Sequence, residues 1–113
     1  MQQNKQLSNP VQELVKKLCD EAGVQLNKKS LHGHTLENKP LSIRISSETS
    51  ESTDRSIGQK ISTIMWKDED NFPILAALYN DTKGLLFELE IWKMNFSIPS
   101  DITGWKNQNL QRN

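Results

Sequence analysis

The sequence predicts an α+β domain in which an N-terminal helix packs on an antiparallel β-meander of about four strands. Two patterns predict this class: apolar residues recur at helical spacing near the N-terminus, and later segments show the alternation typical of strands. The length of 113 residues suits one domain with one hydrophobic core. We therefore predict a single domain over residues 1–113, with frayed ends at 1–8 and 106–113 and a mobile loop at 46–56.

The predicted helix starts near Asn9, which is the expected N-cap, and Pro10 suits its first turn. Gly23 is expected to end the helix in a left-handed conformation. Because a helix of this length is marginal by itself, its apolar face should cover one face of the sheet. That apolar face consists of Val11, Leu14, Val15, Leu18, Cys19 and Ala22.

Four segments are predicted to be strands, and their ranges are 41–46, 59–66, 74–79 and 85–92. The third segment is apolar on both faces, which favours a central position in the sheet. The stretch 46–55 contains no apolar residue, and we therefore expect a loop between the first two strands. In the fourth strand, the row expected to face the core is Leu85, Phe87, Leu89 and Ile91.

Charge and composition narrow the class of partner. Fourteen basic and fourteen acidic side chains give a net charge of zero, whereas binding to nucleic acid by bulk charge needs a basic excess. The longest nearly apolar run is 72–79, far short of the roughly 20 residues that span a bilayer. No apolar segment typical of a secretory signal begins the chain. We therefore expect a soluble cytoplasmic protein without direct contact to nucleic acid or membrane.

Candidate catalytic or metal-ligating residues are few. His32 and His34 can both face a metal ion only from an extended backbone, and a metal site needs at least a third ligand. The single cysteine, Cys19, falls on the apolar face of the predicted helix and is expected to pack in the core. Gly-rich phosphate loops and nucleophile elbows are absent from the sequence. We expect no enzyme activity, no cofactor and no metal; a small metal-binding or enzymatic domain built on the two histidines is the alternative.

The polar side of the last predicted strand carries Glu88, Glu90 and Trp92, which point the same way if the strand is regular. An exposed tryptophan beside two carboxylates is typical of a contact surface between proteins. The alternative is that Trp92 packs beneath a loop or beneath Trp105. We therefore regard this side of the strand as a candidate binding surface.

Residues 66–97 resemble a family of small bacterial proteins without assigned chemistry. Its members carry an Asp-x-Asp-Gly turn, an apolar strand, an Asp-x-x-Gly hairpin and then Leu-Phe-Glu-Leu-Asp-x-Trp-Lys-x-Asp-Phe-Ser. Here the hairpin is present, and residues 86–97 match the final block. The chain departs from the pattern at Asn71, where Gly is usual, and at Glu90 and Asn95, where Asp is usual.

Proteins of this kind are similar in size and style to the immunity proteins of bacterial toxin systems. The resemblance implies a non-enzymatic protein that binds and neutralises a partner toxin in the cytoplasm. A toxin that cleaves nucleic acid presents a basic surface, towards which a local acidic patch steers association. A homo-oligomeric scaffold, with a homodimer as its simplest form, is the other alternative. The expected partner-binding residues are Glu88, Glu90, Trp92, Asp68, Glu69 and Asp70.

Overall fold

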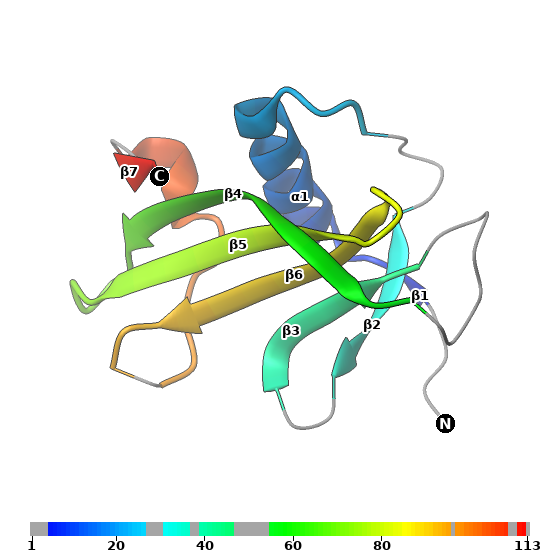
Figure 1. Cartoon of the computed structure of the whole chain (residues 1–113). Coiled ribbons are helices and arrows are strands. Elements are labelled where there is room, and N and C mark those ends of the chain that lie inside the picture. Colours follow the sequence, from blue (N-terminus) through cyan, green and yellow to red (C-terminus); the bar gives the residue numbers. More distant parts are fainter. Residues whose placement is uncertain are drawn as a thin grey trace.

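The computed structural model describes residues 5–26, 31–36, 39–46, 55–95, 97–108 and 111–112. In chain order its elements are β1 (Lys5–Gln6), α1 (Asn9–Ala22), β2 (His32–Leu36), β3 (Lys39–Ile45), β4 (Ile57–Lys67), β5 (Pro73–Asp81), β6 (Leu86–Lys93), the 3₁₀-helix η2 (Gly104–Asn107) and β7 (Gln111–Arg112). The described strands form one antiparallel seven-stranded sheet in the order β1-β2-β3-β6-β5-β4-β7, and α1 packs on β4 and β5 (Figure 1). The predicted α+β class is confirmed, but about four strands was too few, because β2 and the two short outer strands also join the sheet.

β3 does not pair with β4, the next strand in the sequence, but with β6. Ile43 lies opposite Leu89 in this pairing, and Ser42 lies opposite Glu90. The predicted simple meander is therefore wrong at β3, whereas β4, β5 and β6 are consecutive antiparallel neighbours. The connection from β3 to β4 has the length to pass two strands; of the mobile loop predicted there, residues 47–54 lie outside the described residues.

α1 begins and ends close to the predicted residues. Its N-cap is Ser8, which has an extended backbone (φ −62°, ψ 157°), so Asn9 is the first helical residue and not the cap. Gly23 adopts a φ of 71°, as predicted, and its N–H donates to the carbonyl of Asp20. None of the helices that the structure describes is long and apolar enough to cross a membrane. The predicted apolar face is buried at Val11, Leu14, Val15, Leu18 and Cys19.

The helix-facing side of the sheet forms the hydrophobic core. Leu89 is fully buried there, as predicted. Phe87 is also buried but lies outside this cluster, because a register shift beside Asn80 breaks the alternation. Its ring centroid lies 4.1 Å from Cζ of Arg44 and 5.0 Å from Cζ of Arg55. The sheet residues of the core cluster are Ile45, Ile64, Trp66, Ile74, Ala76, Leu78, Leu89 and Ile91.

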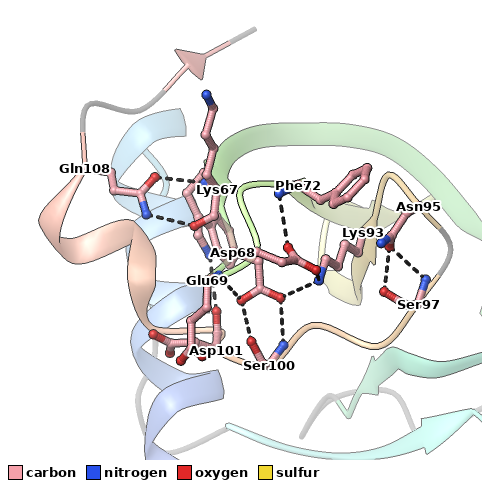
Figure 2. A network of polar contacts seen from close by, with 12 residues as sticks. Lys67, Asp68, Glu69, Phe72, Lys93, Asn95, Ser97, Ser100, Asp101 and Gln108 are labelled. Atoms are coloured by element: carbon pink, nitrogen blue, oxygen red, sulfur yellow. Dashed lines mark hydrogen bonds and ion pairs between the residues drawn. The ribbon is translucent and has the colours of Figure 1, made fainter.

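Both ends of the chain take part in the sheet, where fraying was expected. β1 pairs with β2, and Leu7 is buried beside it, so residues 5–8 are tied to the domain. Within 106–113, β7 pairs with β4, and Gln108 exchanges two hydrogen bonds of 2.8 Å with the backbone of Lys67 (Figure 2). Main-chain pairing to strands that are distant in sequence holds these segments; the other residues of both ends lie outside the described part of the chain.

Candidate partner-binding surface

Lys93, at the end of β6, is buried among carboxylates. Its Nζ donates to Oδ2 of Asp68 over 2.9 Å and to Oδ2 of Asp70 over 2.5 Å (Figure 2). The side chains of Lys93 and Asp68 are 5% and 0% exposed. The hydrogen bond to Asp70 raises the pKa of Lys93, burial opposes this shift, and the bond to Asp68 adds to it. The amine therefore stays protonated, and it is not available as a nucleophile or base.

Asp68, the first residue after β4, is held by Ser100 as well as by Lys93. Its Oδ2 accepts a hydrogen bond from the backbone N–H of Ser100 (2.9 Å), and its Oδ1 accepts one from the Ser100 hydroxyl (2.7 Å). Burial by itself raises the pKa of Asp68, but the hydrogen bonds from Ser100 and Lys93 outweigh it and hold the pKa well below its ordinary value. These contacts, here called the Lys93 network (Asp68, Asp70, Lys93 and Ser100), fasten the loop 97–101 onto the β4–β5 turn.

Segments that are distant in sequence meet in and around the Lys93 network. Asp68 comes from the β4–β5 turn, and Lys93 comes from the end of β6 (Figure 2). Asp70 belongs to the same turn as Asp68. Just beyond β6, Oδ1 of Asn95 accepts hydrogen bonds from the N–H (3.1 Å) and the hydroxyl (2.6 Å) of Ser97. Residues that are separate in the sequence therefore act together in shaping one end of the sheet.

Asn71, in the β4–β5 turn, is the one described residue other than glycine that has a positive φ. Its φ is 72°, in the left-handed region. Glycine adopts this conformation freely, and asparagine is one of the few other residues that tolerate it. Asparagine at this position is therefore compatible with the shape of the turn.

The segments joined by the Lys93 network also carry most of the exposed apolar side chains. Among the described residues six large hydrophobic side chains are exposed, and four of them lie on these segments. Phe72 (47% exposed) belongs to the turn, Trp92 (41%) and Met94 (44%) to the end of β6, and Ile98 (70%) to the loop. The three segments come together at one end of the sheet, on the left in Figure 1. We call these four side chains the tip surface.

Trp92 lies on the face of the sheet that is opposite to α1. It pairs across the strands with Leu75, and Leu75 pairs with Met65, so three apolar side chains form one row over three strands. Leu75 and Met65 are partly buried. Trp105, in contrast, packs against the core cluster on the helix side. The alternative in which Trp92 packs beneath Trp105 is therefore wrong.

Two of the acidic residues predicted to contact a partner are not exposed. Glu88, Glu90 and Trp92 do share one face, as predicted, but Glu88 is buried and its Oε1 lies 3.1 Å from Nη2 of Arg44. Asp68 is buried in the Lys93 network. A cation distant in sequence pairs with each of these two carboxylates, and contact with a partner at these positions stays a prediction. The predicted acids that keep exposed surface are Glu69, Asp70 and Glu90, of which Asp70 is paired with Lys93.

His32 and His34 lie on β2, with His32 exposed and His34 partly buried. Gly33 is required between them, because a Cβ at this position would collide with the backbone carbonyl of Arg44 on β3. Within the described part of the chain, no group of three or more His, Cys, Asp or Glu side chains is placed to hold a metal ion. Gly33 therefore has a packing role between β2 and β3.

The sequence-based prediction missed Lys93 and Ser100 of the network, and Phe72, Met94 and Ile98 of the tip surface. A signal exists for Lys93, because it occupies a core-facing position of β6, and a lysine is rarely buried without an acidic partner. No comparable signal exists for the apolar residues, because single exposed hydrophobic side chains are common in loops. Their grouping depends on contacts that only the folded chain makes.

A family profile matches most of the chain. The family is described as a domain of unknown function (DUF6984), and the match covers residues 4–102. That range includes every residue of the Lys93 network and of the tip surface. No curated protein and no solved structure matches the chain.

Proposed function

The chain belongs to the family described as a domain of unknown function (DUF6984), and we propose that it is a non-enzymatic, immunity-type protein that binds and neutralises a partner bacterial toxin. The observation that carries the proposal is the tip surface, where four of the six exposed large hydrophobic side chains of the described residues gather. Exposed aromatic and methionine side chains grouped in this way are typical of protein interfaces. Trp92 is the proposed anchor, because tryptophan is enriched among the residues that dominate binding energy.

The charges beside the tip surface favour a basic partner. Glu69 is exposed within the β4–β5 turn, and Glu90 lies two residues before Trp92 on the same face. Neither carboxylate forms an ion pair with another described residue. Local negative charge of this kind accelerates association with a basic surface, even though the net charge of the chain is zero.

The Lys93 network supports the same proposal through preorganisation. Lys93, Asp68 and Ser100 link the turn, the strand end and the loop by hydrogen bonds of 2.7 to 2.9 Å. A surface whose segments are already fixed loses less conformational entropy when a partner binds. The network therefore favours tight binding, because it fixes the segments that carry the tip surface.

Two side chains with reactive potential, Lys93 and Cys19, are unsuited to nucleophilic catalysis, and this supports binding over catalysis. Lys93 is held protonated by its two carboxylate partners. Burial, with a smaller contribution from the charge of Asp20, raises the pKa of the Cys19 thiol to about 11. Neither group has the exposure and the pKa of a nucleophile.

Affinity capture followed by a growth assay tests the proposed function. The tagged full chain is captured from lysate of its own host at moderate salt, and the retained protein is then expressed alone and together with the chain. We expect one stoichiometric partner that arrests growth when expressed alone, with growth restored by the wild-type chain and by Ile57→Ala. Trp92→Ala should fail to restore growth; Ile57 is the matched control because it is also exposed (50%) but lies at the far end of β4.

Two outcomes would overturn this proposal. A captured partner that does not arrest growth when expressed alone would show that the partner is not a toxin. A homodimer in solution that Trp92→Ala converts to a monomer would assign the tip surface to self-association.

A further inference from the structure

Glu90 is a partly buried carboxylate that no cation in the described residues neutralises. The residues directly opposite it on the neighbouring strands are Ser42 and Ala77, which are short and uncharged. Its negative charge also acts on Tyr79. Burial is the main cause of the raised pKa of Tyr79, and the charges of Glu90 and Glu88 add to this shift. A partner that covers Glu90 removes more of its hydration, and this is costly unless the partner supplies a positive charge.

An exposed aromatic ring stands beside this carboxylate. Trp92 follows Glu90 by two residues on the same face of β6, in a part of the strand whose pairing with β5 is regular. Two residues along a strand span about 7 Å. A long basic side chain that pairs with Glu90 can therefore also reach to within about 6 Å of the Trp92 ring, the range in which a cation and an aromatic face attract each other.

The same sheet already holds one arginine in an arrangement of this kind. Nη2 of Arg44 lies 3.1 Å from Oε1 of Glu88, while its Cζ lies 4.1 Å from the ring centroid of Phe87. One guanidinium thus contacts a carboxylate and an aromatic ring together. Glu90 and Trp92 offer the same two chemical groups on the neighbouring part of the strand, and no cation in the described part of the chain pairs with Glu90.

We propose that Glu90 and Trp92 form a binding site for an arginine side chain of the partner. This inference rests on the proposed function and names the chemistry that the partner brings to the tip surface. Arginine fits better than lysine, because its planar guanidinium can stack on an indole and still donate two hydrogen bonds to a carboxylate. A lysine ammonium is more strongly hydrated and cannot stack.

Nuclear magnetic resonance on the ¹⁵N-labelled full chain tests this site without any partner. Three blocked tripeptides, Gly-Arg-Gly, Gly-Lys-Gly and Gly-citrulline-Gly, are added at equal concentrations and equal ionic strength. The readout is the indole N–H resonance of Trp92, assigned from its loss in Trp92→Phe. We expect the arginine peptide to shift this resonance at least about threefold more than the lysine peptide, with no response to citrulline.

Glu90→Gln is the decisive variant, because it keeps the shape of the side chain and removes the charge. It should reduce the arginine response to the level of the citrulline peptide. The control Glu13→Gln, on α1 at the opposite face of the sheet, should leave the arginine response unchanged. Equal responses to the three peptides, or an unchanged arginine response in Glu90→Gln, would overturn the arginine site.

The peptide experiment and the capture experiment can fail independently. If the arginine peptide is selected but no toxic partner is captured, the proposed function fails and the arginine site stands. If a toxic partner needs Trp92 but Glu90→Gln leaves the peptide response unchanged, the arginine site fails and the proposed function stands.

Discussion

Nζ of Lys93 lies 2.9 Å from Oδ2 of Asp68, and the two side chains are 5% and 0% exposed. An ion pair this deeply buried gains little net free energy over an apolar pair, because both charges lose their hydration. Its hydrogen bonds are directional, however, and with Ser100 they fix how the turn, the strand end and the loop meet. The pair therefore determines the shape of the tip surface more than the overall stability.

Removing one partner of the Lys93–Asp68 ion pair should lower the stability of the fold. We expect Asp68→Asn to lower the free energy of unfolding by about 3 kcal/mol, because Lys93 then stays buried without its buried counter-charge. Urea denaturation followed by circular dichroism measures the change. The control is Glu69→Gln, since the neighbouring Glu69 is exposed, and its effect should stay below about 0.5 kcal/mol. Equal effects of the two substitutions would contradict the role given to Asp68.

The stability of the fold should decrease in acid, because Asp68 and Asp81 become protonated. Burial tends to raise the pKa of Asp68 and Asp81, but hydrogen bonds outweigh it in the folded state and lower both pKa values below the ordinary 3.8. A lowered folded-state pKa contributes stability that is present above the unfolded-state pKa and lost as the pH falls through the folded-state value. We therefore expect the urea midpoint to fall once the pH drops below about 4.

Asp68→Asn provides the control for this pH dependence. Because the variant has no carboxyl group at this position, the fall of its urea midpoint in acid should be smaller than that of the wild type. Curves with the same acid slope for both proteins would show that Asp68 does not contribute.

The core row of β6 gives a prediction that is independent of the tip. Leu89 is fully buried, and its truncation leaves a cavity among residues of α1 and the sheet. We expect Leu89→Ala to destabilise the fold by about 2–5 kcal/mol. Ile98→Ala, at a side chain that is 70% exposed, should change the stability by less than about 0.5 kcal/mol. An unchanged urea midpoint in Leu89→Ala would show that this row of β6 does not belong to the core.

The Cys19 thiol should be unreactive in the folded protein. It is fully buried, and burial raises its pKa to about 11, so little thiolate forms near neutral pH. We expect a colorimetric disulfide reagent to modify Cys19 only as fast as the chain unfolds, and at the rate of a free thiol in denaturant. Rapid modification under native conditions would show an open path to the thiol.

The parts of the fold that depend on local pattern could be predicted from the sequence. The helical spacing of apolar residues and the left-handed Gly23 define α1, and alternation defines most of β4 and β6. The pairing of β3 with β6 could not be predicted, because strand order depends on contacts between segments that are distant in sequence. β2 was missed because Gly33 and two histidines do not resemble a strand, although the glycine is what permits the close approach to Arg44.

The candidate partner-binding surface could likewise be predicted only as far as local sequence patterns determine it. The shared direction of Glu90 and Trp92 follows from strand alternation, and the structure confirms it. The sequence pattern does not predict which carboxylates remain exposed. Glu88 is paired with Arg44 and Asp68 with Lys93, and each pair joins residues that are too far apart in sequence for a local pattern to indicate. The sequence therefore indicates where acids occur, and the fold decides which of them can meet a partner.

The affinity of the captured partner for matched variants of the chain tests the central claim most directly. Isothermal titration calorimetry on the purified partner gives the dissociation constants for the wild type, Trp92→Ala and Ile57→Ala. If the tip surface binds the partner, Trp92→Ala should weaken binding by at least about tenfold, whereas Ile57→Ala should leave the dissociation constant unchanged. The same dissociation constant for all three proteins would contradict the claim that the tip surface is the binding site.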